Sequence, residues 1–225
     1  MPGSIGEVTR HPPLEEYLET VLELGEDGVV VTQARLAERL GHSAPTVSQM
    51  VRRLVAEGYL EITSRVLALT EKGRERAEAV VRKHRLAERL LTDVIGLAWD
   101  KAHEEAGRWE HVISDEVEEL IVTLLNNPST CPHGNPIPGA PPEVKLLSAL
   151  GGCLPGDRIR LERVTEQVEV DQETLRYLAD HRFTPGTDAS VRTRAADGTL
   201  VLDLVDGSIA VGPSLAGQLF VAAAR

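Results

Sequence analysis

Residues 32–58, TQARLAERLGHSAPTVSQMVRRLVAEG, decide the fold of the first part of the chain. Thr32 is placed to cap a short helix that ends at Gly41. Ser43 is placed to cap a second helix, with Pro45 in its first turn, where a missing N–H costs nothing. The pattern predicts two short helices joined by a tight turn. The apolar face of the second helix consists of Val47, Val51, Leu54 and Val55.

The stretches on either side complete a known supersecondary arrangement. Residues 14–25, LEEYLETVLELG, have apolar residues at helical spacing up to Gly25. Residues 59–70, YLEITSRVLALT, form two short β-like runs that meet near Ser64 and Arg65. A helix, a helix-turn-helix and a β-hairpin together describe a winged helix-turn-helix. The alternative is a helical hairpin that serves only for packing.

The start of the helix after Ser43 favours DNA binding over packing. A packing helix would bury bulky side chains there, whereas a recognition helix needs a slim end that reaches base edges. Gln49 is suited to read adenine, Pro45 to contact a thymine methyl group, and hydroxyl groups to hold phosphates. The hydroxyl groups belong to Ser43, Thr46 and Ser48, and backbone charge comes from Arg52, Arg53 and Arg65.

The charge distribution agrees with a specific DNA contact. The chain has 225 residues, enough for two compact domains or three small ones, and a formal net charge of −11, which argues against nonspecific nucleic-acid binding. Residues 35–89 nevertheless contain 12 Lys and Arg against 7 Asp and Glu, and the remainder contains 12 against 28. One basic module in an acidic protein suits DNA, and the acidic surroundings suit cations.

Composition also indicates a cytoplasmic protein. The N-terminus, MPGSIGEVTRHPP, has no apolar run typical of a signal peptide, and no stretch approaches the ~18 apolar residues of a membrane span. Cys131 and Cys153 are too few for a disulfide scaffold. We therefore expect a reducing cytoplasm and no membrane contact.

The rest of the chain predicts a helical region followed by a small β-barrel. Thr70 is placed to cap a long helix that ends at Gly96, a second helix follows over 99–113, and Ser114 is placed to cap a third. These helices carry broad apolar faces that suit dimerisation, and the Pro/Gly-rich segment 132–142 is predicted to be a linker. From about residue 146, short strands with turn signals and one helix predict a barrel. We expect a mainly α chain with β in three domains, residues 1–71, 72–140 and 146–225.

Several histidines, carboxylates and one thiol share helix faces or sit close together. His84 and Glu88 are four residues apart, and His103 shares a face with Glu110 and His111. These are ligand types of first-row divalent metals. The alternatives are core histidines, surface ion pairs and, for Cys131 and His133, a free cysteine and a surface histidine in a connector.

These motifs resemble a known family. RKHRLAERLL, RWEHVISDEV, NNPSTCPHGNPIPG and SAPTVSQ are similar to segments of the diphtheria-toxin-repressor family of metal-dependent transcriptional regulators, and the similarity covers nearly the whole chain in the same order. The resemblance implies a winged helix, a metal-binding dimerisation domain and an SH3-like C-terminal barrel of the FeoA type. It implies a repressor, not an enzyme, that acts as a homodimer on a palindromic operator, with one or two dimers per operator.

The resemblance implies two metal sites per subunit. The ancillary site of iron regulators corresponds to His84, Glu88, His103, Glu166 and Glu169, where Glu169 stands in place of the usual Gln. Streptococcal-type manganese regulators complete a site near here with Cys-x-His, which Cys131 and His133 match, and their metal is expected to be shared with Glu88.

The activating site implied by the family corresponds to Glu110 and His111 together with Glu16 of the first helix. The position of the family's Cys or Glu falls on Gly107, which has no side chain to ligate, so water, a carbonyl or Glu19 is the candidate replacement. Because the sulfur ligands of iron regulators are missing, we expect Mn²⁺ as the activating metal, with Fe²⁺ as the alternative.

The expected mechanism is that metal binding at the activating site holds the first helix and sets the spacing of two recognition helices to half-sites ~34 Å apart. A metallohydrolase is the alternative from another class, but no ligand set comes with an evident general base, and the helix-turn-helix would be unexplained. In a third interpretation the metal faces are vestigial or structural, and Gly107 is its best support.

Overall fold

The computed structural model describes residues 13–141 and 146–224. Residues 1–12 of the N-terminal stretch used for the signal-peptide prediction, and Pro142 at the end of the predicted linker, lie outside these ranges. The chain divides into two compact units, Met1–Val81 and Arg82–Arg225. None of the helices in the described ranges is long and apolar enough to cross a membrane.

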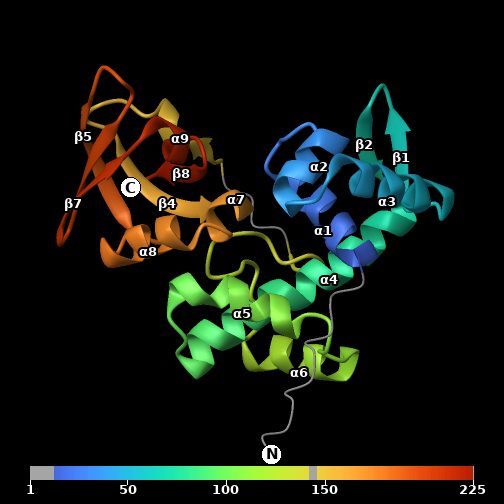
Figure 1. Cartoon of the computed structure of the whole chain (residues 1–225). Helices are drawn as coiled ribbons and strands as arrows, with labels where there is room; N and C mark the ends of the chain where they lie inside the picture. Colours follow the sequence, from blue (N-terminus) through green and yellow to red (C-terminus); the bar gives the residue numbers. More distant parts are fainter. Residues whose placement is uncertain (1–12, 142–145, 225) are drawn as a thin grey trace, which may run out of the picture. The chain divides into compact units, whose positions relative to one another are not determined.

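The first unit is a winged helix-turn-helix, as predicted (Figure 1). The Thr32 side chain accepts a hydrogen bond from Arg35 N at 3.3 Å, and the Ser43 side chain accepts one from Thr46 N at 3.4 Å. Gly41 ends the first helix of the pair in the left-handed region, with φ 64°. The elements are α1 (Pro13–Glu26), α2 (Gln33–Leu40), α3 (Ala44–Ala56), β1 (Leu60–Thr63), β2 (Val66–Leu69) and the start of α4 (Glu71–Arg89).

The wing is an antiparallel hairpin in which Thr63 pairs with Val66. The two turn residues between them, Ser64 and Arg65, both have positive φ, 51° and 72°. A two-residue turn of this hand matches the twist of the flanking strands, although it is formed here without glycine. The predicted meeting point of the two strands is therefore confirmed, and Arg65 is exposed at the tip of the wing.

The core of the first unit is the apolar face that the helical periodicity predicts. Leu18 of α1, Leu36 of α2, Val51 of α3 and Leu67 of β2 are all buried in one cluster. Val55 is the exception in the predicted apolar face, with 37% exposure. Because the buried face of α3 is held by the core, its opposite face is left to solvent.

The second unit begins with a helical layer in which the helix from Thr70 ends at Gly96, as predicted, but the next helix ends earlier than predicted. The helix from Thr70 turns π-helical over Leu90–Ile95 before Gly96, and the helix predicted over 99–113 consists of a 3₁₀ turn (Trp99–Lys101) and α5 (Ala102–Trp109). α6 (Asp115–Leu124) begins at its predicted cap, because Ser114 accepts from Val117 N at 3.3 Å. The early end of α5 places Glu110 at the helix terminus.

The C-terminal part of the second unit is the predicted small β domain. Its six strands form an antiparallel sheet in the order β3-β8-β4-β5-β6-β7, with irregularities in the β4–β8 and β5–β6 pairings. The sheet encloses a large apolar cluster that includes Leu161, Leu175 and Phe183. The elements are β3 (Ser148–Ala149), a 3₁₀ turn (Leu150–Gly152), β4 (Arg158–Val164), α7 (Glu166–Glu169), α8 (Gln172–Asp180), β5 (Asp188–Arg194), β6 (Leu200–Leu204), β7 (Gly207–Val211), α9 (Pro213–Ala216) and β8 (Leu219–Ala223).

The Pro/Gly-rich segment that was predicted to be a linker is instead packed into the second unit. His133, Asn135 and Ile137 within it are buried, as is Cys131 directly before it. Gly134 lies so close to β4 that a Cβ built on it would stand 1.9 Å from the carbonyl oxygen of Glu162. Prolines prevent a helix here but do not prevent burial, because their carbonyl groups find donors elsewhere in the unit.

Candidate metal centre and recognition helix

The second half of α4 presents a histidine and a carboxylate on one buried face. His84 Nε2 lies 3.3 Å from Glu88 Oε1. His103 of α5 adds a second imidazole, with Nδ1 3.1 Å from His84 Nε2 and 3.5 Å from Glu88 Oε1. Glu88 has no exposed surface, so its carboxylate is removed from solvent among these imidazoles.

Cys131 and His133 reach the same carboxylate from the segment after α6. His133 Nδ1 lies 3.1 Å from Glu88 Oε1, while Nε2 faces the carbonyl oxygen of Trp99 at 3.3 Å. A ring nitrogen that donates to a carbonyl leaves the other nitrogen as the ligand atom. Cys131 is fixed by short backbone hydrogen bonds, its N–H to Asn135 O at 2.8 Å and its C=O from Gly134 N at 3.0 Å.

The barrel contributes the remaining carboxylates from α7. Glu169 Oε2 lies 2.9 Å from His133 Nδ1 and 3.4 Å from His103 Nδ1, and Glu166 Oε2 lies 3.8 Å from His103 Nδ1. Asn135 donates to the other oxygen of Glu169 and to Val164 O. Local sequence patterns do not indicate that the barrel meets α4, since these residues are some 80 positions from Glu88, but the family resemblance implied it and the structure brings them together.

Arg85 and Asn135 take part in this centre but were not among the predicted residues. Arg85 is fully buried and donates to Glu166 Oε1 at 2.8 Å. Arg82, Arg85 and Arg89 also donate from one face of α4 to carbonyl oxygens of Pro138, Pro136 and Thr130. The contact between α4 and the proline-rich segment could have been predicted from two features. The arginines lie at helical spacing on one face, and the carbonyl groups of the segment lack sheet partners.

The charged groups shift one another's proton affinities strongly. Burial alone would raise the pKa of Glu88, but the imidazole of His133, with those of His103 and His84, holds it well below its ordinary value. Burial would lower the pKa of His103, yet the hydrogen bond to Glu169 and its other carboxylate neighbours raise it to about 10. Burial and the nearby carboxylates raise the pKa of the Cys131 thiol to about 12. The imidazoles thus offset the carboxylate charge, and a bound cation would take over that role.

The spacing of the donor atoms fits a first-row divalent metal ion. In the part of the chain that the structure describes, both oxygens of Glu88, Nδ1 of His133 and Oε2 of Glu169 are buried and make no hydrogen bond of ordinary geometry, although they lie close together. The imidazole–carboxylate separations given above run from 2.9 to 3.5 Å for Glu88 and Glu169. Ligands bound at ~2.1 Å around one ion stand roughly 3.0–3.4 Å apart, so the spacing matches a coordination sphere.

The residues expected at the activating site divide between the two units. Glu110 lies in the second unit, where it hydrogen-bonds His84 Nδ1 and where Oε1 lies 3.0 Å from His111 Nε2. Glu16 and Glu19 lie on α1 in the first unit, both half-buried. Glu110 is therefore joined to the ancillary set through His84, and the two sets predicted as separate sites are in contact within the second unit.

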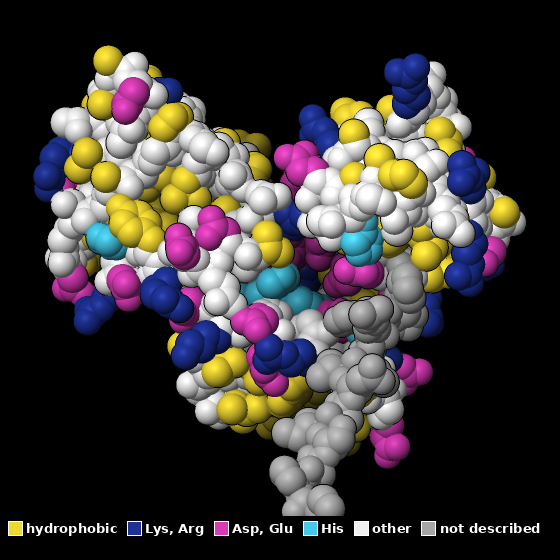
Figure 2. All heavy atoms as spheres, viewed as in Figure 1, with side chains coloured by type: hydrophobic (Ala, Val, Ile, Leu, Met, Phe, Trp, Pro, Cys, Tyr) yellow, Lys and Arg dark blue, Asp and Glu magenta, His cyan; other side chains and the backbone are white. Residues whose placement is uncertain are grey.

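The predicted DNA-contacting residues lie on the solvent face of α3 and on the wing. Ser48 is half-buried, and its hydroxyl accepts from Arg52 Nη1 at 3.2 Å. Arg53 pairs with Glu57 at 2.7 Å, which lowers its value as a phosphate contact. Figure 2 shows Lys and Arg side chains gathered along the edge of this unit. The exposed members of the set are Ser43, Pro45, Thr46, Gln49, Arg52, Arg53 and Arg65.

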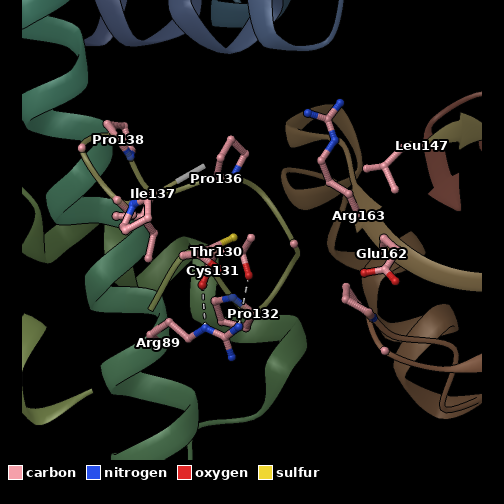
Figure 3. A pocket seen from close by; sticks show the side chains of 17 residues that line it. Arg89, Thr130, Cys131, Pro132, Pro136, Ile137, Pro138, Leu147, Glu162 and Arg163 are labelled. Carbon is pink, nitrogen blue, oxygen red and sulfur yellow. Dashed lines mark hydrogen bonds between the residues drawn. The ribbon is translucent and has the colours of Figure 1, made fainter. Parts of the chain in front are cut away.

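A hollow of about 610 Å³ opens beside the metal-ligand cluster. Its lining comes from Arg89, the segment that contains Cys131, and the barrel around Glu162 and Arg163 (Figure 3). Arg89 spans its floor by donating to Thr130 O at 2.8 Å. Cys131, which is 1% exposed, is the member of the ligand cluster that contributes to this lining.

Each of the three parts of the chain matches a known protein family. Residues 11–65 match the N-terminal DNA-binding domain of iron-dependent repressors, residues 70–139 match their metal-binding and dimerisation domain, and residues 148–223 match the FeoA domain. The iron-dependent repressor IdeR of Mycobacterium tuberculosis is 45% identical over 202 residues, covering 84% of this chain and 87% of the relative. The chain belongs to the diphtheria-toxin-repressor family.

Other members of the diphtheria-toxin-repressor family differ in their metals. The diphtheria toxin repressor of Corynebacterium diphtheriae is 43% identical over 205 residues, covering 84% of this chain and 87% of the relative. A solved manganese-dependent transcriptional repressor in complex with manganese has a TM-score of 0.83 at 31% identity and covers 94% of this chain and 100% of its own. The manganese regulator SloR has a TM-score of 0.76 at 30% identity, covering 96% and 100%. This family member is accordingly a metal-dependent repressor, with DNA and a second copy of the chain as indicated partners.

Proposed function

We propose that this family member is a manganese-responsive repressor that binds a palindromic operator as a homodimer. The observation that carries the proposal is the buried group of Glu88, Cys131, His133 and Glu169, whose ligand atoms all lie within 4.8 Å of one another. Its Cys-x-His corner matches the manganese-type pattern. The absence of Met and Cys at the activating positions, occupied here by Glu16 and Gly107, favours a harder cation.

The residues of the chain would prepare the centre before metal binds. Arg85 neutralises Glu166, Asn135 orients Glu169, and the Trp99 carbonyl fixes the ring of His133. Bound Mn²⁺ would supply positive charge to the buried carboxylates. Metal activates the repressor only to the extent that it binds the DNA-competent arrangement more tightly than the others.

A second copy of the chain is the partner that suits the outer face of α6. Val117, Leu120 and Leu124 recur at helical spacing and are 45%, 63% and 62% exposed. Figure 2 shows apolar side chains gathered on the helical layer. The match of residues 70–139 to a dimerisation domain supports this assignment. We propose that residues 1–71 contact the operator, 72–140 bind metal and dimerise, and 146–225 complete the metal centre.

An iron-responsive repressor is the second candidate. It is favoured by the relatives named as iron-dependent at 45% identity, which is higher than the 31% identity of the manganese-dependent neighbour. The thiolate of Cys131 would also accept Fe²⁺ or Zn²⁺. No catalytic activity is part of either proposal.

Fluorescence anisotropy with DNA from the protein's own promoter region tests the proposal. Anaerobic titrations at cellular metal concentrations compare Mn²⁺, Fe²⁺ and a chelator. We expect operator binding with Mn²⁺ and none with chelator. Activation by Fe²⁺ but not Mn²⁺ would replace the first candidate with the second. Glu110→Ala and His111→Ala are expected to remain dimeric but to lose the metal response, and full metal stimulation in both would place the activating set elsewhere.

A further inference from the structure

A polar contact joins the first helix of the first unit to the turn before the recognition helix. The Tyr17 hydroxyl of α1 lies 3.0 Å from Nδ1 of His42, and the centroids of the two rings are 5.7 Å apart. Tyr17 is only 1% exposed, so its hydroxyl is removed from water and needs a partner within the unit. The hydrogen bond therefore ties the ring of His42 to α1.

His42 lies in the turn between α2 and α3. Gly41 before it has φ 64°, and the N–H of His42 donates to Ala37 O at 3.1 Å. Directly after it, Ser43 caps α3 by accepting from Thr46 N at 3.4 Å. Because the backbone of His42 leads straight into this cap, a displacement of His42 would shift the start of α3, where the residues expected to read the operator lie.

Glu16, the residue before Tyr17, is the one that the family resemblance implies as the metal ligand of α1. Its backbone carbonyl accepts the Thr20 hydroxyl at 2.7 Å, and Thr20 is itself buried. Leu18 and Val21 hold the same helix in the core of the first unit. Because hydrogen bonding and core packing both hold this part of α1, a metal bound by Glu16 would restrict the position of Tyr17 as well.

The hydrogen bond adds a directional contact to an apolar core. Burial of apolar area imposes no fixed direction, so it alone allows small shifts of α3 against α1. A hydrogen bond weakens steeply as its angle departs from linearity. The contact between Tyr17 and His42 is thus suited to hold the turn before α3 in one orientation relative to α1.

We propose that Tyr17 and His42 are positioning residues that couple metal binding at α1 to the orientation of the recognition helix. The inference rests on the proposed function in one respect, namely that metal stimulates operator binding. The alternative is that the hydrogen bond only satisfies a buried hydroxyl. In that case its loss changes operator affinity by the same factor with and without metal, whereas loss of a coupling contact changes the ratio of the two affinities.

Fluorescence anisotropy with the full-length protein and DNA from its own promoter region measures this ratio, in Mn²⁺ and in chelator. Tyr17→Phe keeps the buried ring and removes the hydroxyl. We expect the affinity ratio to fall about 2- to 10-fold, the range that one net hydrogen bond accounts for. An unchanged ratio overturns the inference. Tyr59→Phe removes a phenol hydroxyl elsewhere in the same unit and is expected to leave the ratio unchanged.

Variants of His42 test the other end of the contact. His42→Ala removes the acceptor, so we expect the same fall in the ratio as in Tyr17→Phe and no further fall in the double variant, because both changes remove one interaction. His42→Asn keeps an acceptor, Oδ1, near the position of Nδ1 and is expected to retain the wild-type ratio. Equal falls in His42→Ala and His42→Asn, or additive falls in the double variant, overturn the inference.

Amide hydrogen exchange of the wild type needs no variant and so does not depend on variant folding. We expect Mn²⁺ to slow exchange at residues 41–46 as well as in α1, and slower exchange in α1 without the turn overturns the inference. Operator binding separates the two proposals. A wild type whose operator affinity does not respond to metal overturns the proposed function together with the inference, whereas a metal response with an unchanged ratio in Tyr17→Phe overturns the inference alone.

Discussion

The metal centre and the recognition helix are both polar sites, but one is buried and the other exposed. Glu88, His133 and Glu169 are at most 2% exposed, whereas Gln49 and Arg52 on α3 face solvent. A buried polar group needs a partner, so each side chain of the centre is tied to several others. An exposed one keeps water until DNA replaces it. Changes in the centre should therefore alter stability and metal binding together, and changes on α3 should alter DNA binding alone.

The largest expected effect comes from Arg85. Arg85→Ala leaves Glu166 buried without its ion pair, and removal of one partner of a buried pair costs ~3–5 kcal/mol. We expect the free energy of unfolding from urea denaturation to fall by that amount and metal content to fall with it. Leu161→Ala in the barrel core is the matched control, since it costs a similar ~2–5 kcal/mol through lost packing but leaves the metal ligands in place. Normal metal content in Arg85→Ala would contradict the coupling.

Removal of metal should have the second-largest effect on stability, and we expect that effect to be confined to the region around the metal centre. A ligand at 100 times its Kd stabilises the folded state by ~2.7 kcal/mol. The helical layer has only small apolar clusters around Leu86 and Ala87, so we expect chelation to increase amide hydrogen exchange in α4–α6 and in residues 129–138. The barrel strands serve as the internal reference. If chelation increased amide hydrogen exchange in β5–β7 as much as in α4–α6, bound metal would not stabilise the helical layer selectively.

On the exposed side, Gln49→Ala should weaken operator binding by ~1–3 kcal/mol without changing stability. Ser43→Ala/Pro45→Ala should also act selectively on the operator. Arg52→Ala should weaken binding to operator and random DNA alike, because it supplies backbone charge. Anisotropy with both DNAs and a melting curve for each variant make the measurement. An equal loss on the two DNAs for Gln49→Ala would remove Gln49 from the base-reading set.

The smallest effect is expected from substitutions of Gly107, which test whether this position of α5 belongs to the activating site. A Cβ built on Gly107 meets no atom within 4 Å in the described part of the chain, so a side chain fits there without a clash. Gly107→Ala should stabilise α5 by ~0.5–1 kcal/mol through helix propensity alone. Gly107→Glu should also strengthen Mn²⁺ activation, and Gly107→Cys should shift preference toward Fe²⁺. Identical metal responses in all three variants would separate this position from the activating site.

Helix caps and turns were largely predictable, because they depend on neighbouring residues. Thr32, Gly41, Ser43 and Ser114 end or begin helices where the sequence indicates. The helix of residues 99–113 was predicted too long, since helical periodicity continues through Glu110 and His111 while the backbone leaves the helix after Trp109. Local propensity does not define such an end when tertiary contacts such as His84 to Glu110 decide it.

The segment after α6 was the main error of the sequence interpretation. Its prolines correctly exclude a helix, but the prediction of a linker over residues 132–142 was wrong. The arginines of α4 supply donors for its carbonyl groups, and Gly134 allows close approach to β4, so the segment is buried. Neither contact is visible from the composition of the segment alone.

The winged helix, the order of the elements and the residue types of a metal centre could be predicted from the sequence, because helical and strand periodicity and side-chain chemistry are local properties. The family resemblance implied that ligands of α4, α5 and α7 share a site with Cys131 and His133. No local pattern indicated this, and the folded chain brings them into one buried cluster. That outcome depends on contacts between residues as far apart as Arg85 and Glu166, whose free energies come from burial and charge pairing in the folded chain. The same packing joins Glu110 to His84, although the family resemblance implied an activating site for Glu110 and an ancillary site for His84.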